Sequence, residues 1–233
     1  MKGALVAFTP TFLPVPVPDV IVFQYNPETM SHAWLQEEPE RMPGEQAGNP
    51  YAVTGMPGET FSFTLAMSSN EDIADGSAPA AAIARASGIY SRLAALELLL
   101  YPKQTSTALV GTVSAAISSE LSGAGAGSSR AVAQAILPVT LFIWGQGRIV
   151  PVRITDLTIT EQLYDAALNP TYVEAELRLR VLTPEELVGV SADDDVLGSL
   201  AKVAYEYTLT LRRTLAAANL ANAAESIIGL IPR

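Results

Sequence analysis

The stretch that decides the fold is Thr171-Tyr-Val-Glu-Ala-Glu-Leu-Arg-Leu-Arg-Val-Leu182. Apolar and polar side chains alternate along it, the apolar set from Val173 to Val181 and the polar set from Tyr172 to Arg180. Successive side chains of a strand point to opposite faces of its sheet, so this alternation predicts a strand with one buried face and one solvated face. A strand of this kind is typical of an antiparallel sheet.

Other segments extend the same sheet in both directions. Leu137–Trp144, Arg148–Ile154 and Leu157–Tyr164 are rich in β-branched and aromatic residues and are separated by short turns. Nearer the start, the same composition marks Val20–Tyr25, and Glu59–Met67 alternates phenylalanine or leucine with polar residues. These segments predict an antiparallel meander.

Two segments have a helical pattern. Ala80–Tyr101 carries an apolar stripe at a spacing of about 3.6 residues among alanines, and Pro102 ends it. Val196 to about Ile228 is rich in alanine and leucine, although Gly198 disfavours helix there. We therefore expect an α+β fold, a mainly antiparallel barrel or sandwich with one internal helix and a C-terminal helical tail.

The expected organisation has three parts. Residues 1–19, with prolines at alternate positions from Pro14 to Pro18, form an extended N-terminal arm that we expect to be retained, since it lacks the features of a signal peptide. Residues 20–190 form the β domain, which includes a flexible loop rich in Gly, Ser and Ala at about 103–135. Residues 191–233 form the C-terminal helical extension.

Composition excludes several classes of function. The chain has no cysteine, so disulfides, thiolate metal sites and cysteine nucleophiles are ruled out. A net charge of −10 disfavours nucleic acid as a partner, because phosphate binding needs clustered Lys and Arg. No stretch reaches the roughly 18 apolar residues of a membrane-spanning helix. Hydrophobic residues make up 49% and charged residues 16%, which favours burial of extra surface against neighbouring subunits.

Residues with catalytic or ligand-binding chemistry do not form a recognisable site. His32 is the only histidine and accompanies no nucleophile motif, so a structural hydrogen bond is the favoured interpretation. The carboxylate pairs, such as Glu185 and Glu186, are adjacent in sequence, whereas a glycosidase needs two carboxyl groups on opposite sides of one bond. Asp193–Asp195 lacks the spaced ligands of a calcium loop, and Gly123–Gly127 lacks the ending of a phosphate loop. We expect no catalytic residue, cofactor or metal.

Four segments resemble, in the same order, a known family. They are Val22-Phe-Gln-Tyr-Asn-Pro-Glu-Thr-Met30, Leu141-Phe-Ile-Trp-Gly145, the run from Val152 to Asp165, and Leu168-Asn-Pro-Thr-Tyr-Val-Glu-Ala-Glu-Leu-Arg-Leu179. Together they resemble the tube protein family of phage-tail-like contractile injection systems over about residues 20–184. The resemblance implies a tube-type β-barrel or sandwich in a six-fold ring at the junction of inner tube and baseplate, next to the spike hub.

The resemblance also implies partners and structural motif residues. The partners would be copies of the chain in a homo-hexameric ring and the neighbouring tube, spike or hub, and baseplate proteins, assembled in the cytoplasm, with release of the particle left open. Members of the family often carry a C-terminal LysM-like module, whereas here an Ala- and Leu-rich tail takes its place. The motif residues are Phe23, Tyr25, Asn26, Pro27, Glu28, Trp144, Gly145, Asn169 and Pro170.

Three alternatives stay open at this point. The chain is a tail component of a true bacteriophage, or a cell-wall-binding or peptidoglycan-degrading baseplate module, or a transported effector enzyme. The second needs an aromatic binding stripe or separated acid and base residues, and the third needs a catalytic cluster in a pocket. For the favoured structural role, the expected β core contains Phe23, Tyr25, Trp144, Ile154, Leu157, Leu163 and Leu177.

Overall fold

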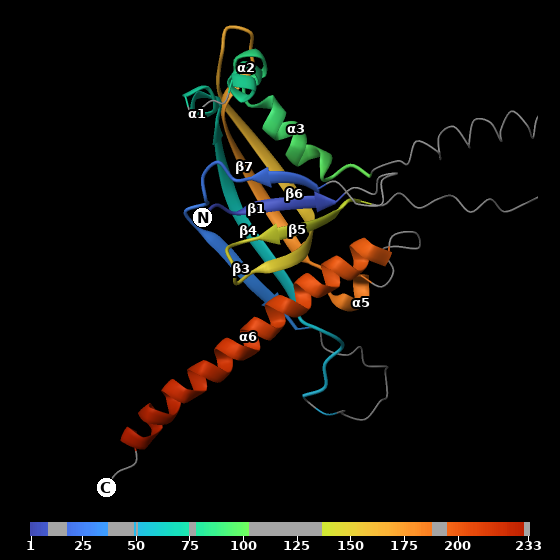
Figure 1. The fold of residues 1–233 in the computed structure, drawn as a ribbon, viewed down its shortest axis with the longest axis vertical. Helices are drawn as coiled ribbons and strands as arrows, with labels where there is room; N and C mark the ends of the chain where they lie inside the picture. Colours follow the sequence, from blue (N-terminus) through green and yellow to red (C-terminus); the bar gives the residue numbers. More distant parts are fainter. Residues whose placement is uncertain are drawn as a thin grey trace, which may run out of the picture.

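Figure 1 shows the computed structural model, which describes residues 1–8, 18–36, 49, 51–74, 78–102, 137–187 and 195–230. Seven strands form one sheet in the order β2-β1-β5-β6-β7-β4-β3, and all neighbouring strands are antiparallel. The α+β class and the mainly antiparallel sheet are therefore as expected. The strands are β1 (Ala4–Phe8), β2 (Pro18–Val22), β3 (Met30–Leu35), β4 (Gly58–Ser68), β5 (Val139–Ile143), β6 (Ile149–Tyr164) and β7 (Pro170–Val181).

The N-terminal segment differs from the extended arm expected over residues 1–19. Ala4–Phe8 forms strand β1, which lies inside the sheet between β2 and β5. Leu5 and Ala7 of this strand are fully buried. The short apolar run that precedes the proline-rich residues 14–18 therefore supplies an interior strand.

The sheet curls strongly but does not close into the expected barrel. β2 and β3 are its two outer strands, and only residues 23–29 connect them. Just past β2, the side chain of Gln24 bonds the backbone of Ser68 at the end of β4, although four strands separate β2 from β4 in the sheet. Among the described residues no backbone ladder joins β2 to β3 or β4. The sheet is therefore open, and side chains bridge its gap.

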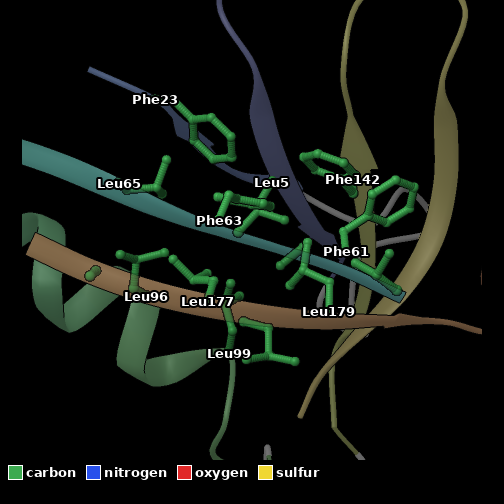
Figure 2. Close-up of a cluster of buried hydrophobic side chains, with 14 of the residues drawn as sticks. Leu5, Phe23, Phe61, Phe63, Leu65, Leu96, Leu99, Phe142, Leu177 and Leu179 are labelled. Carbon is green, nitrogen blue, oxygen red and sulfur yellow. The ribbon is translucent and has the colours of Figure 1, made fainter. Parts of the chain in front are cut away.

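Aromatic side chains fill the concave face of the curled sheet. Phe142 of β5 contacts Phe61 and Phe63 of β4 at ring-centroid distances of 5.3 and 5.5 Å, and Phe23 lies 5.6 Å from Phe63. Figure 2 shows these rings grouped between the strands, with helical leucines such as Leu96 packed beside β7. Burial of large aromatic side chains stabilises such a core by a few kcal/mol each.

The expected core residues divide into three groups. Phe23, Ile154 and Leu177 are buried in the core as predicted. Trp144 and Leu157 are partly buried and pack against it. The prediction was wrong for Tyr25 and Leu163, which are 39% and 70% exposed. Tyr25 lies beyond the end of β2, and Leu163 lies near the tip of a hairpin where the strands leave the core.

The helix expected over residues 80–101 is two helices, α2 (Ala78–Ser87) and α3 (Tyr90–Leu98), preceded by the short α1 (Ser69–Ala74). Gly88 separates them with a φ of 58°, which is costly for residues with a Cβ. A Cβ there would lie 2.4 Å from the carbonyl oxygen of Pro170, which accepts a hydrogen bond from the Ile89 N–H. This contact joins the helices to the start of β7.

The two strands expected at Arg148–Ile154 and Leu157–Tyr164 are one long strand, β6, with an irregularity between Ile154 and Asp156. A bulge of this kind bends a strand without ending it. β6 and β7 form a long hairpin that runs from the core to an exposed tip, visible beside α2 in Figure 1.

The terminal helix α6 (Asp195–Leu230) is continuous in spite of Gly198. Its first half packs on the sheet: Leu197, Ala201 and Tyr205 are buried, and Tyr205 belongs to the main core. The Thr208 hydroxyl accepts a hydrogen bond from the Ile149 N–H and donates one to the Ile149 carbonyl, at 3.1 and 2.7 Å. Beyond the sheet the helix projects away from the domain (Figure 1). Tertiary packing thus overrides the low helix propensity of a single glycine.

Some predictions fall on residues outside the described part of the chain. They are the loop expected at about 103–135, the Gly123–Gly127 segment within it, and the first two aspartates of Asp193–Asp195. After β7 the chain forms the short helix α5 (Pro184–Leu187), which is capped because the Thr183 N–H donates to the Glu186 carboxylate and the Glu186 N–H donates to the Thr183 hydroxyl.

Candidate functional site

Asn26 of the family-like motif holds the start of the chain. Its side-chain oxygen accepts a hydrogen bond from the Gly3 N–H at 2.9 Å, and its amide donates to the Met1 carbonyl at 3.0 Å. Gly3 must be a glycine here, because a Cβ would lie 2.7 Å from both Phe23 and Trp144. Asn26 and Phe23 therefore fix β1 at its place in the sheet.

The other motif residues of this loop line an open groove of about 670 Å³. Tyr25, Pro27 and Glu28 form one wall, and the outward side chains of β4 and β7 form the floor. Glu174 on the floor accepts a hydrogen bond from the Tyr172 hydroxyl at 3.1 Å. This bond to a carboxylate raises the pKa of Tyr172 above its usual value. The groove thus combines two tyrosines with two carboxylates.

Trp144 and Gly145 lie at the turn between β5 and β6. The Trp144 N–H donates to the Arg148 carbonyl at 2.9 Å, and Gly145 has a φ of 69°, which suits glycine. The indole packs on Phe23 and Phe142 at ring-centroid distances of 6.4 and 6.1 Å. The structure therefore brings Trp144 together with Phe23, two motif residues that are far apart in sequence.

Asn169 and Pro170 close the hairpin between β6 and β7. Asp165 organises the turn, since its carboxylate accepts hydrogen bonds from the Asn169 N–H, the Asn169 side chain and the Ala167 N–H, at 2.8 to 3.0 Å. These bonds, those of Asn169 above all, lower the pKa of Asp165. Pro170 is buried and contacts the helices as described above. The role of this motif is to shape the turn.

A second polar cluster lies at the opposite end of β4, where Glu59 is 3% exposed. Arg212 of α6 donates to both carboxylate oxygens of Glu59, at 3.0 and 2.5 Å. His32 of β3 contacts the same carboxylate with Nε2 at 2.6 Å. Paired hydrogen bonds between a guanidinium and a carboxylate are stronger than those between neutral groups. A buried carboxylate requires such partners, because burial removes it from water. We call Glu59, His32 and Arg212 the Glu59 cluster.

Aromatic rings and one further arginine surround the Glu59 cluster. The His32 ring stacks on Phe61 and contacts Trp34 at a tilt, with ring-centroid distances of 4.1 and 3.7 Å. The Arg148 guanidinium lies 5.1 Å from the centre of the Phe61 ring. Burial lowers the pKa of His32 below 6.5, and the bond to Glu59 opposes that shift only in part. His32 therefore serves as a hydrogen-bond partner of Glu59 beside the Glu59–Arg212 ion pair.

The Glu59 cluster offers little for catalysis. A His–carboxylate pair activates a nucleophile only if a hydroxyl or thiol lies within hydrogen-bond reach of the histidine. Among the described residues the hydrogen-bond partner of the His32 ring is Glu59 alone. Two further carboxylates have structural partners: Asp72 binds Arg92 at 2.6 and 2.8 Å, and Glu186 caps α5. Within the described ranges, no group of three or more His, Asp or Glu residues is placed to hold a metal ion.

No protein-family model matches the chain, and no curated protein matches it. Exposed features of the described residues that a partner could contact include the groove, the outer strands β2 and β3, the charged outer face of β7, and the outer half of α6. None of the described helices is long and apolar enough to cross a membrane.

The Glu59 cluster is the feature that sequence reasoning missed. A signal was present, because Glu59 continues the buried alternation of Phe61, Phe63 and Leu65. A carboxylate at a buried position of a strand requires a cationic partner. That partner, Arg212, is distant in sequence and on a helix whose orientation the pattern alone did not determine.

Proposed function

We propose that the chain is a structural, non-catalytic subunit of a phage-tail-like contractile injection system. In this proposal it forms a homo-hexameric ring at the junction of inner tube and baseplate, links the tube to the spike, hub or baseplate, and assembles in the cytoplasm. The observation that carries the proposal is the ordered set of segments that resemble the tube protein family, at 22–30, 141–145, 152–165 and 168–179. The tube-type fold is part of this proposal.

The outer strands of the sheet support ring formation. β2 and β3 each pair with one strand only among the described residues, so each offers one free edge. Apolar side chains are exposed along both: Val20 and Val22 on β2 are 51% and 47% exposed, and Trp34 and Leu35 on β3 are 54% and 67% exposed. An edge contact between β2 of one copy and β3 of the next is heterologous, and such contacts generate rings when the rotation closes.

The outer half of α6 supports contacts with a different protein. Leu215 and Leu220 are 61% and 68% exposed on a helix that projects beyond the sheet (Figure 1). A projecting helix with exposed leucines is suited to pack against a groove or helix of a neighbour. In this proposal its partner is a tube, spike, hub or baseplate protein.

Cryo-electron microscopy of particles purified from the native host, with this chain tagged, tests the proposal. We expect density for the chain in a symmetric ring between tube and spike, with six copies. A chain found free, or only as cargo in the tube lumen, would contradict it. Turbidity measurements on peptidoglycan suspensions test the non-catalytic part, and clearing by the purified chain would contradict that part.

A further inference from the structure

The outer face of β7 carries its charges in two blocks. Glu174 and Glu176 come first, and Arg178 and Arg180 follow at the same alternate spacing. Side chains at alternate positions of a strand project from one face, and here that face is opposite to the buried Leu177. The first half of the strand therefore presents negative charge and the second half positive charge.

The neighbours of these four side chains on β4 are small. On the β4 side, each of them lies opposite a residue with a short side chain. Those residues are Ala66, Thr64, Ser62 and Thr60, in the order of their partners from Glu174 to Arg180. On the β6 side, Thr160 and Thr158 flank the glutamates, Asp156 lies opposite Arg178, and Arg153 lies opposite Arg180. The charges thus form a ridge along β7 that another molecule can reach.

Few contacts within the chain use these charges. Glu174 accepts a hydrogen bond from Tyr172, and Arg180 forms an exposed ion pair with Glu186. Among the described residues, the side chains of Glu176 and Arg178 have no hydrogen-bond or ion-pair partner. Exposed ion pairs such as that of Arg180 are weak, so they exchange readily for contacts with a partner.

The charge order along β7 is negative, negative, positive, positive, so a second copy of the strand running in the opposite direction places an opposite charge against each of the four side chains. We propose that this face binds a second copy of the chain across a two-fold axis at Leu177, with the two β7 strands antiparallel. Glu174 then lies opposite Arg180 of the second copy, and Glu176 lies opposite Arg178 of the second copy. In the parallel arrangement like charges would coincide and repel each other. The two-fold contact is isologous, so each attractive pair occurs twice.

The groove accepts the end of the facing strand. Its floor includes Glu174 and Tyr172, and Glu28 adds a second carboxylate from the loop after β2. Arg180 of the second copy reaches this end of the ridge in the antiparallel arrangement. A guanidinium binds carboxylates and also stacks on aromatic faces, and the groove offers both. The occupant that the charge and the aromatic lining favour is thus an arginine side chain.

This contact is independent of the ring proposed above. A cyclic ring is closed by heterologous contacts, whereas the β7 contact pairs two chains, or two rings face to face. The ring can therefore be disproved without disproving the β7 contact, and the β7 contact without disproving the ring. A chain that forms rings through its strand edges without pairing through β7 would overturn only the present inference.

Charge reversal of the full chain tests the contact. One variant carries Glu174→Arg and Glu176→Arg, and the other carries Arg178→Glu and Arg180→Glu. We expect each variant alone to lose the two-fold association at least about tenfold in affinity, because its ridge then repels its own copy. We expect an equimolar mixture to form mixed pairs, because a wholly basic ridge then meets a wholly acidic one.

Native mass spectrometry of the variants, one of them isotopically labelled, measures the pairing. Circular dichroism first establishes that both variants are folded. The matched control reverses two exposed helical charges, Arg85→Glu and Glu97→Arg, and should pair as the original chain does. Three results would overturn the inference: an original chain that never pairs at low salt, reversed variants that pair as strongly as the original, or a mixture that forms no mixed pairs.

Discussion

The side-chain amide of Gln24 hydrogen-bonds both the N–H and the carbonyl of Ser68, as the backbone of a neighbouring strand would. It donates to the Ser68 carbonyl at 2.7 Å and accepts from the Ser68 N–H at 2.6 Å. Gln24 is 7% exposed, so water does not readily replace these bonds. One side chain thus bridges the two ends of a sheet whose outer strands do not pair.

Removing this bridge should destabilise the fold. Gln24→Ala leaves the N–H and carbonyl of Ser68 without partners, and we expect the free energy of unfolding to fall by about 1–3 kcal/mol. Urea denaturation followed by circular dichroism measures the change. Gln162→Ala is the control, since Gln162 is exposed on β6, and it should cost under about 0.5 kcal/mol. Equal losses in the two variants would contradict a special role for Gln24.

Arg212 should matter far more than its neighbour Arg213. Arg212→Ala leaves the buried Glu59 carboxylate with His32 as its direct partner, and we expect a loss of about 2–4 kcal/mol. Arg213→Ala removes an exposed charge on the same helix turn and should change stability by less than about 0.5 kcal/mol. Thermal unfolding of the two variants checks this. The double variant Arg212→Ala with Glu59→Gln should recover part of the loss, because no unpaired charge then remains.

Stability should decrease as the pH falls through the range of histidine. The folded protein holds the pKa of His32 below 6.5, mainly by burial, with Arg148 and Arg212 also lowering it and Glu59 raising it. The unfolded chain therefore binds the proton more readily, and stability present above about pH 6.5 is lost below it. Chemical denaturation at about pH 7.5 and about pH 5.5 should show a smaller loss for His32→Gln than for the original chain. If both proteins lost the same stability between the two pH values, the pH dependence would come from groups other than His32.

Truncations of α6 should separate its two halves. Deleting residues 214–233 removes the projecting half, and we expect a folded domain of nearly unchanged melting temperature. Deleting residues 196–233 also removes Tyr205, Thr208 and Arg212, and we expect the remaining chain to unfold or aggregate. Circular dichroism and thermal melts of both truncations test this. A stable fold in the longer deletion would show that α6 is a separate appendage, as the residue pattern first indicated.

Much of the sheet could be predicted from sequence because alternation determines which face of a strand is buried. This holds for β4 and β7, whose inward phenylalanines and leucines are nearly all in the core. The pattern could not show that β1 lies inside the sheet, because this strand is short and its second neighbour, β5, comes from a distant part of the chain. It also gave no sign that a side chain, Gln24, would bridge the open sheet.

The candidate surfaces were predictable only in part. The loop containing Asn26 was singled out, but its groove depends on Thr64, Tyr172 and Glu174 from two other strands. The break at Gly88 was missed because a helical stripe continues on both sides of it, and only the contact with Pro170 requires the turn. Long-range contacts of this kind are set by topology, which local periodicity does not encode.

The pairing of Glu59 with Arg212 has a consequence for synthesis on the ribosome. The carboxylate is made 153 residues before the guanidinium that neutralises it, and β1 likewise waits for β5. Until α6 has left the exit tunnel, the emerging chain carries an acidic group where its interior should close. Completion of the core therefore waits until α6 has emerged, and the hydrophobic strands of the sheet stay exposed to aggregation until then.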